Sequence, residues 1–375
     1  TAVSLSELMF MPYREDRNLD ALTDALFADE LCTTLRADVT QEEIDGLKAR
    51  LESEGSYYLY PAALADQLAL AEELLQGQTP GVLLNGIESR SGGPDSTRYQ
   101  QGGSVLQPLG AAAQGGSEIT VYASGIPEGE SVTLWATQFN AEVSAWKSQV
   151  GTIQNGRNVL VVPKIGSGTT SRGGSLYLTY GGSAPENIRL HVRRAVDIPM
   201  VNLSGWYGME ESDRRSLLQS YVEELDAYLA QPALSSGDQT ANCLNVTEIA
   251  TPTVLLSLPA AAVSGGAGKG SAEQRADTLY DSILAWEDVM HICKTTQGIA
   301  NTYENNDMQT RQNIRCMTMF AGAFMYAAGD HVGIGYGSCS GMAAGKPISQ
   351  LETGASANRL FGWGIAHEIG HNMDK

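Results

Sequence analysis

Three residues near the carboxyl end of the sequence have the types and the spacing of a catalytic zinc site. His367 and His371 stand four positions apart, so on a helix they share one face and can direct two imidazole nitrogens at a single metal ion. Glu368 follows the first histidine and could take a proton from a zinc-bound water and return it to a leaving amine. Zinc lowers the pKa of such a water toward about 7. This HExxH pattern therefore predicts hydrolysis, most often of a peptide bond.

The predicted zinc site lacks one ligand within this sequence. A catalytic zinc ion takes three protein ligands and a water, whereas only four residues follow His371. Asp374 shares the helix face but lies a turn too far along to be an easy third ligand, so we expect it to orient a histidine instead. We therefore expect the third ligand to lie beyond Lys375, and the chain to be part of a longer or cleaved protein.

Apolar residues around the HExxH pattern favour a buried helix, which is where a catalytic zinc helix belongs. They are Leu360, Phe361, Trp363, Ile365, Ala366 and Ile369. Glycine is less favourable than alanine in a helix by about 1 kcal/mol, yet Gly362, Gly364 and Gly370 interrupt this stretch. The glycines indicate that another backbone packs closely here.

Charge and composition argue against two classes of partner. The 375 residues include 43 acidic and 24 basic side chains, for a formal charge of −19. Nucleic acids and anionic membrane surfaces both require a basic patch, so we expect neither as a partner. No apolar run approaches the length of about eighteen residues that a transmembrane helix needs. The chain begins at Thr1 without a signal-type segment, as a removed signal peptide or a trimmed sequence would leave it.

The five cysteines show no CxxC spacing, so they do not predict a structural zinc site. In an exported protein Cys316 and Cys339 could form a disulfide. With an odd number of cysteines, at least one stays unpaired within the chain.

The sequence predicts a multidomain α+β fold, which begins with a helical segment at residues 1–85. Leucines repeat at helical spacing within residues 16–35. Thr40 begins a capping box for a second helix that runs to Leu51. Pro61 opens a third helix that runs to Leu75. This segment contains no histidine, so we expect it to be a scaffold.

Residues 86–198 predict a β-sandwich accessory domain with a Gly/Ser-rich lead-in at 91–116. Beyond the lead-in, apolar and polar residues alternate and turn signals recur, as in the strands of a sandwich. The predicted strands are 119–123, 132–136, 159–162, 176–180 and 188–192. His191 in the last strand is expected to face solvent or core rather than a metal.

Residues 199–375 predict the N-terminal part of a zincin-like metallopeptidase domain, truncated at the HExxH helix. Its expected elements are a helix at 213–229, a buried strand at 254–262 and a long helix at 272–297. Asp330-His331 predicts an exposed turn. After it, the glycine-rich run from Val332 to Tyr336 has little side-chain bulk, and two interpretations are open.

In the first interpretation, Val332 to Tyr336 is the edge strand of a substrate cleft, with Gly333, Gly335 and Tyr336 along it. A peptide could then lie close to the strand and pair with it. In the second, the glycines only shape a loop. The sequence favours neither.

The order of these segments resembles the M60-like (enhancin-type) metallopeptidases. The residues that carry the resemblance are Trp363-Gly364 before HEIGH at 367–371, and the run MYAAGDHVGIGY at 325–336, which is similar to that family's cleft strand. The sandwich segment 118–192 resembles the family's accessory domain. The resemblance covers roughly residues 100–375.

This resemblance implies a secreted or cell-surface bacterial enzyme that acts on mucins and other O-glycosylated proteins. Carried over to this sequence, it makes His367 and His371 ligands of Zn²⁺ and Glu368 the general base. The family's third ligand is a glutamate downstream of the second histidine, and this sequence contains none there.

Three hypotheses follow for the function. The first is a zinc endopeptidase that cleaves mucin-like glycoproteins, with glycans as further partners. The second is a glycan- or protein-binding adhesion module in which the sandwich binds and the peptidase half is incomplete or inactive. The third is a zinc hydrolase for a non-peptide bond, since it would share the same HExxH pattern.

Overall fold

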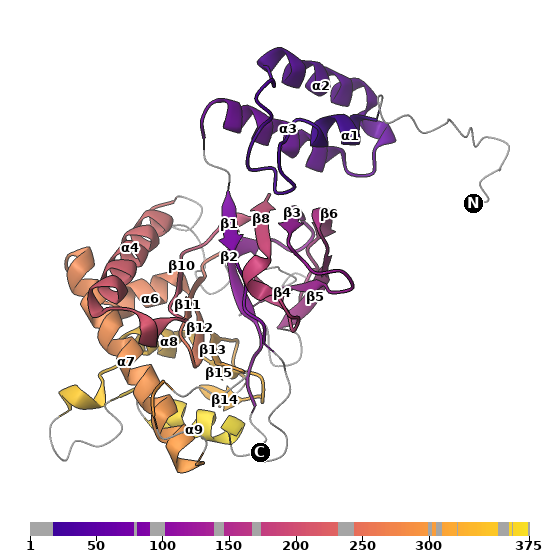
Figure 1. Cartoon of the computed structure of the whole chain (residues 1–375). Helices are drawn as coiled ribbons and strands as arrows, with labels where there is room; N and C mark the ends of the chain where they lie inside the picture. The colour runs from indigo at the N-terminus through magenta and orange to yellow at the C-terminus, as the bar shows by residue number, and fades with distance from the viewer. Residues whose placement is uncertain are drawn as a thin grey trace, which may run out of the picture.

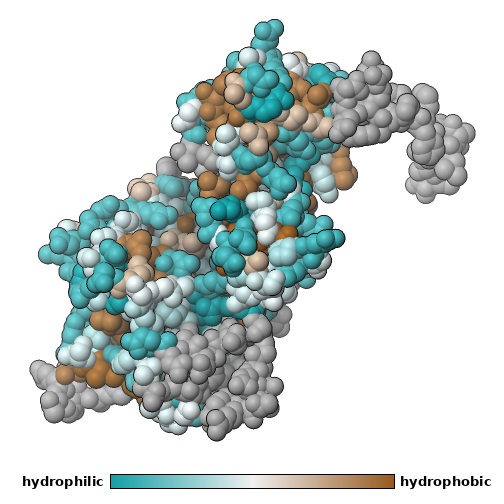
Figure 2. Space-filling view, in the orientation of Figure 1, coloured by the Kyte–Doolittle hydropathy of each residue, from teal (hydrophilic) through white to brown (hydrophobic). Residues whose placement is uncertain are grey.

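The chain forms a helical segment, a pair of packed sheets and a third sheet covered by helices, in that order (Figure 1). The computed structural model describes residues 18–78, 81–90, 102–138, 146–166, 174–231, 244–298, 302–304, 310–320, 322–351, 360–361 and 363–373. Hydrophilic residues cover most of the described surface in the view of Figure 2. Among these residues, no helix combines the length and apolar character needed to cross a bilayer.

The helical segment contains α1 (Leu19–Asp24), α2 (Gln41–Glu54) and α3 (Pro61–Leu75). The side chain of Thr40 accepts a hydrogen bond from the backbone N–H of Glu43, and Pro61 stands in the first turn of α3, as predicted. The three helices share a core that includes Ile44 and Leu68. The short 3-10 turn Gly55–Tyr57 connects α2 to α3.

The predicted helix at 16–35 is wrong beyond Asp24. The carboxylate of Asp29 accepts hydrogen bonds from the backbone N–H groups of Leu31, Thr33 and Thr34, at 2.7–3.2 Å. These bonds replace the helical ones and close a loop, because an aspartate side chain competes with the backbone for its own neighbours.

Two sheets form the sandwich. The first has the order β1 (Val82–Asn85), β8 (Arg189–Arg193), β3 (Glu118–Ser124), β6 (Gly156–Val161). The second has the order β5 (Lys147–Ile153), β4 (Val132–Thr137), β7 (Gly174–Thr179), β2 (Gln107–Ala113), β9 (Val196–Asp197). Alternate residues such as Val121 and Leu134 point from the two sheets into one shared core.

Two details of this region differ from the sequence analysis. The predicted Gly/Ser-rich lead-in at 91–116 includes strand β2, in which every residue is buried. Strand β1 lies within the segment expected to be helical, and it pairs with β8. The division of the chain at residues 85 and 198 stays a prediction.

The third sheet is mixed, with the order β10 (Met200–Asn202), β11 (Thr247–Ala250), β12 (Val254–Leu258), β13 (Gln312–Cys316), β15 (Val332–Ile334), β14 (Met325–Ala327). Neighbours β10–β11, β12–β13 and β13–β15 are parallel, whereas β11–β12 and β14–β15 are antiparallel. Strand β14 is the last of the described strands on its side, so one of its edges is not paired with another described strand.

Helices cover this mixed sheet and share its core. They are α4 (Glu211–Leu229), α6 (Ala260–Gly266), α7 (Ala272–Thr296), α8 (Tyr336–Cys339) and α9 (Trp363–Met373). Short 3-10 turns lie at Pro185–Asn187, Trp206–Gly208, Ser340–Ala343 and Ile348–Gln350.

The predicted strand 254–262 ends at Leu258, because Pro259 caps the start of α6. A complete capping box at Ser271 and Gln274 begins α7. Cys316 and Cys339 are both buried and are not joined by a disulfide.

The sandwich is joined to the mixed sheet by buried polar side chains. Tyr177 of β7 donates a hydrogen bond to Glu248 of β11, and Ser257 of β12 donates one to the same carboxylate at 2.8 Å. Glu248 is fully buried, and its burial raises the pKa from an ordinary value of 4.5 to about 7. At the other end of the sheet, Lys147 of β5 forms an ion pair with Asp330, 2.6 Å between Nζ and Oδ2.

Candidate metal centre

Helix α9 carries the HExxH pattern and is fixed by one apolar face. Ile365, Ile369 and Met373 recur every four residues and are buried in the core of the mixed sheet. Just before the helix, the ring of Phe361 stacks on Trp286 of α7, with centroids 4.1 Å apart. These contacts leave His367 and His371 exposed on another side of the helix.

The two histidines lie outside this apolar face and converge. His367 and His371 are both exposed, and their Nε2 atoms are 2.9 Å apart. Their ring centroids are 4.4 Å apart and the planes meet at 81°. Two nitrogen ligands of a tetrahedral zinc ion, each about 2.0–2.1 Å from the metal, are about 3.3 Å apart. The pair therefore fits two positions of a zinc ion after a shift of a few tenths of an ångström.

A catalytic zinc ion takes three protein ligands, and His367 and His371 are candidates for two of them. No group of three or more His, Cys, Asp or Glu side chains in the described part of the chain could hold a metal ion. Asp374, expected to orient a histidine, lies outside the described residues. The roles of His367, His371 and Glu368 at a metal stay predictions.

A cleft of about 400 Å³ lies between α9 and the outer strand β14. Its lining from the helix is Glu368, His371 and Asn372, and its lining from the strand is Met325, Tyr326 and Ala327. The half-buried Glu368 is thus placed beside the second histidine and opposite a sheet edge. An edge strand offers backbone N–H and C=O groups that an extended peptide can pair with.

The prediction that Val332 to Tyr336 is the edge strand is wrong. Strand β15 lies between β13 and β14 and pairs with both. A Cβ on Gly333 would come within 2.3 Å of the Tyr326 ring, so this glycine makes room for a neighbouring side chain. A Cβ on Gly335 would lie 3.2 Å from Met319, and Tyr336 begins α8. Glycine spacing marks close packing, and it does not tell an inner strand from an outer one.

One glycine does bring the walls of the cleft together. A Cβ on Gly364 would lie 3.1 Å from Sδ of Met325 and 3.4 Å from the ring of Phe324. This is the close backbone approach that the glycines of the HExxH stretch indicate. The first turn of α9 is therefore packed directly against the start of β14.

Asn372 is a residue of this site that the sequence analysis missed. It is fully buried, and its Oδ1 accepts a hydrogen bond from the backbone N–H of Gly329 at 2.8 Å. Its Nδ2 donates to the carbonyl of His331 and to Oε1 of Gln312, both at 3.2 Å. Its own carbonyl accepts from Gly102. A polar residue on the buried face of a helix was the signal that could have revealed it.

His331 is buried, so the prediction of an exposed turn is wrong for it. Its Nδ1 lies 2.7 Å from Oδ1 of Asp330. Burial lowers the pKa of His331, and the hydrogen bond to Asp330 only partly opposes this. Burial acts to raise the pKa of Asp330, but the hydrogen bonds from His331 and Lys147 outweigh it and hold the pKa below its ordinary value. The turn between β14 and β15 is therefore tied to the sandwich by charge.

Comparison with solved structures gives a likeness of fold. The chain is similar to the CBM32-1, CBM32-2 and M60 catalytic domains of Clostridium perfringens ZmpB, with a TM-score of 0.65 at 20% identity over 94% of this chain and 34% of that one. It is also similar to the M60 catalytic domain of Clostridium perfringens ZmpC in complex with the sialyl T antigen, with a TM-score of 0.57 at 21% identity over 78% of this chain and 52% of that one. This is the M60 metallopeptidase fold.

A third structure with this likeness is a metallopeptidase from Bacteroides thetaiotaomicron, with a TM-score of 0.58 at 13% identity over 89% of this chain and 49% of that one. The chain thus spans between a third and about half of the length of these structures. No protein-family model and no curated protein sequence matches the chain. The M60 likeness therefore concerns the fold alone.

Proposed function

We propose that this chain acts in a zinc-dependent endopeptidase that hydrolyses peptide bonds in mucin-like, O-glycosylated proteins outside a bacterial cell. The observation that carries the proposal is the convergence of the His367 and His371 Nε2 atoms to 2.9 Å. Glu368 stands beside this pair in the cleft and faces the edge strand β14. The M60 fold supports the same reaction class.

Each wall of the cleft has its own part in this mechanism. When bound, zinc would act as a Lewis acid toward a carbonyl oxygen and a water molecule. An extended substrate lies along β14, the outer of the described strands, and the strand fixes the direction of its backbone. Glu368 accepts a proton from the attacking water and passes it to the leaving amine. Asn372 and Gly364 hold the helix and the strand at the spacing that these steps need.

The substrate class is supported by a relative. The M60 catalytic domain of Clostridium perfringens ZmpC was solved in complex with the sialyl T antigen. The edge strand in the cleft favours a peptide over a non-peptide substrate for this chain, because a strand edge recognises backbone amides. We propose that an O-linked glycan on the substrate is recognised together with the peptide.

A second candidate is an adhesion module that binds glycans or proteins while its peptidase half is inactive. The observation that favours it is that the described residues contain no third metal ligand. Binding of mucin by the full-length protein, with neither zinc nor cleavage, would support this candidate.

The test uses the full-length protein with an O-glycosylated mucin and a matched Glu368→Gln variant. We expect the native protein to contain zinc and to cleave mucin, and the variant to keep its zinc while cleavage falls by a factor of about 10² to 10⁴. His371→Ala should lose zinc as well as cleavage. Equal cleavage by the Glu368→Gln variant would remove Glu368 from the mechanism.

A further inference from the structure

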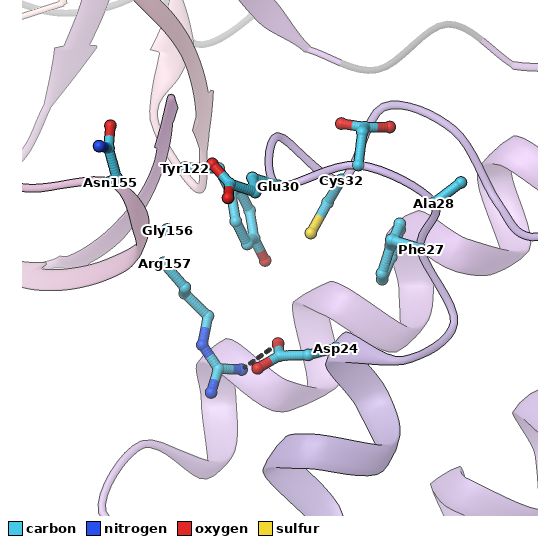
Figure 3. Close-up of a pocket in the computed structure, with 10 residues that line it drawn as sticks. Asp24, Phe27, Ala28, Glu30, Cys32, Tyr122, Asn155, Gly156 and Arg157 are labelled. Carbon is cyan, nitrogen blue, oxygen red and sulfur yellow. Dashed lines mark ion pairs between the residues drawn. The ribbon is translucent and has the colours of Figure 1, made fainter. Parts of the chain in front are cut away.

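A second cavity, of about 500 Å³, lies between the helical segment and the outer face of the β1-β8-β3-β6 sheet. Its volume is within the range of about 300–1,000 Å³ typical of small-molecule sites. The residues that line it are Asp24, Phe27, Ala28, Asp29, Glu30, Cys32, Tyr122, Asn155, Gly156 and Arg157 (Figure 3). It is separate from the cleft beside α9, since the two share no lining residue.

The strand pattern explains why polar side chains meet here. Val121 and Ala123 of β3 point into the sandwich core, so Thr120 and Tyr122 point the other way, toward the helical segment. Tyr122 is paired in register with His191 of β8, and their ring centroids are 5.6 Å apart. The outer face of this sheet is therefore polar although it is covered.

The opposite wall is the loop that Asp29 closes. Both carboxylate oxygens of Asp29 accept hydrogen bonds from backbone groups of the loop. Cys32 has a φ of 53°, a left-handed conformation that is uncommon for a residue with a side chain. Such a backbone is kept when surrounding structure holds it, and it is often found at binding sites. Figure 3 shows the Cys32 thiol and the Tyr122 hydroxyl both directed toward the middle of the cavity.

Several buried polar atoms at this junction have no hydrogen-bond partner among the described residues. They are the Tyr122 hydroxyl, Nε2 of His191, and the hydroxyls of Thr23 and Thr120. Tyr122 is 1% exposed and lines the cavity, and His191 is 0% exposed and contacts the loop through Nδ1 and the carbonyl of Leu31. Buried polar groups are nearly always partnered, so the unpartnered Tyr122 hydroxyl at the cavity indicates a polar ligand.

The charges of the wall restrict the ligand. Asp24, Asp29 and Glu30 outnumber the single cation, Arg157, which disfavours an anion. Arg157 is held by Asp20 and Gln67, each at 2.6 Å. Burial raises the pKa of the Cys32 thiol to about 12, so the thiol adds no charge at neutral pH. No set of three ligating side chains in the described part of the chain could bind a metal ion here.

The hydrogen-bonding groups of the cavity wall restrict the choice of ligand further. The Asp24 carboxylate already accepts a hydrogen bond from Gln67 at 2.8 Å and forms an ion pair with Arg157 at 3.6 Å. The exposed carboxylate of Glu30 only accepts hydrogen bonds, so the ligand must donate. The Tyr122 hydroxyl has a proton to donate, so the ligand must also accept. An ammonium ion donates but cannot accept, so it would leave the proton of the Tyr122 hydroxyl without an acceptor. A sugar hydroxyl does both and carries no charge.

We infer that this cavity binds a neutral carbohydrate residue. Glu30 accepts hydrogen bonds from its hydroxyls, and the Tyr122 hydroxyl donates to it from the floor of the cavity. The site is independent of the metal centre, because its residues come from the helical segment and the outer sheet of the sandwich. In a glycoprotein-directed protein it would hold a glycan away from the scissile bond.

The test is saturation-transfer NMR with free galactose, N-acetylgalactosamine and glucose on the full-length protein, with Tyr122→Phe as the main variant. We expect at least one of these sugars to bind, and Tyr122→Phe to weaken it about ten-fold, as the loss of one hydrogen bond would. Because this hydroxyl has no partner among the described residues, the variant should keep the melting temperature of the native protein. Glu30→Gln should also weaken binding.

Two controls make the result decisive. Tyr57→Phe changes a tyrosine that is 85% exposed and does not line the cavity, so it should leave binding unchanged. Glu368→Gln should keep sugar binding while it loses cleavage, which separates this site from the proposed peptidase. Absence of binding by all three sugars, equal binding by Tyr122→Phe, or a preference for N-acetylneuraminic acid or methylammonium would overturn the inference.

Discussion

The junction between the sandwich and the mixed sheet has two ends, and a carboxylate behaves oppositely at each. At the far end from the metal centre, Glu248 is fully buried among hydroxyl groups, and its pKa is raised to about 7. At the near end, Asp330 is 37% exposed in its side chain and pairs with Lys147 and His331, and its pKa is lowered. Burial without a direct cationic partner favours the neutral acid, whereas a cationic partner favours the carboxylate.

The opposite pKa shifts of Glu248 and Asp330 show which contacts hold the cleft in place at neutral pH. The turn between β14 and β15, which follows the strand that lines the cleft, is tied to the sandwich by an ionised pair and to α9 by Asn372. The far end relies on a carboxylate that is partly protonated at neutral pH. We therefore expect changes of pH to weaken the far end first and to leave the metal centre in place.

The largest expected effect on stability is the pH dependence of the free energy of unfolding that Glu248 causes. Its pKa in the folded protein exceeds the ordinary value of 4.5, so between pH 4.5 and about 7 the unfolded chain loses a proton that the folded chain keeps. The free energy of unfolding therefore falls as the pH rises through this window, by a few kcal/mol in total. Glu248→Gln should abolish this slope.

Urea unfolding of both proteins at pH 4.5, 6 and 8 measures the difference directly. We expect Glu248→Gln to gain stability relative to the native protein as the pH rises, and the gain to level off above pH 7. A difference that does not vary with pH would show that Glu248 titrates normally in the folded state.

The next largest effect on stability is expected at Asn372, which holds the turn between β14 and β15 beside the metal centre. Asn372→Ala removes the acceptor for the N–H of Gly329 and the donor to the carbonyl of His331. Loss of these buried hydrogen bonds should lower the free energy of unfolding by about 2 kcal/mol. The exposed Asn187 provides the matched control, since Asn187→Ala should change stability little. Equal stabilities of the two variants would contradict the role of Asn372.

The smallest effect is the coupling between Lys147 and Asp330. Both side chains are about one third exposed, so the pair should contribute only about 0.5 kcal/mol at pH 7. A double-mutant cycle with Lys147→Met and Asp330→Asn measures it. The coupling should decrease in high salt, and also below pH 3.8, where Asp330 begins to protonate in the unfolded state. A coupling insensitive to salt and pH would mean that packing, not charge, joins these residues.

The convergence of the two histidines could be predicted because it is local in sequence, whereas their role at a metal stays a prediction. The spacing of His367 and His371 and the apolar residues around them follow the period of one helix. In the same way, Thr40 and Pro61 predict where α2 and α3 begin. Short-range rules of this kind need no knowledge of the rest of the fold.

The wall opposite the helix could not be predicted, because strand order is a tertiary property. Nothing in the glycine-rich run at 332–336 reveals that β14 lies outside β15. The buried strand β2 was hidden by a composition typical of loops, and the end of α1 depends on the Asp29 carboxylate. The cavity at Tyr122 depends on how the helical segment covers the sheet, which the alternating pattern does not show.

The most direct test of the central claim is X-ray absorption spectroscopy at the zinc edge on the zinc-loaded, full-length protein. We expect at least two imidazole nitrogens at about 2.0–2.1 Å from zinc. His371→Ala should lose one of these nitrogen ligands, and Glu368→Gln should keep both. A zinc ion without imidazole ligands, or a spectrum that His371→Ala leaves unchanged, would contradict the central claim.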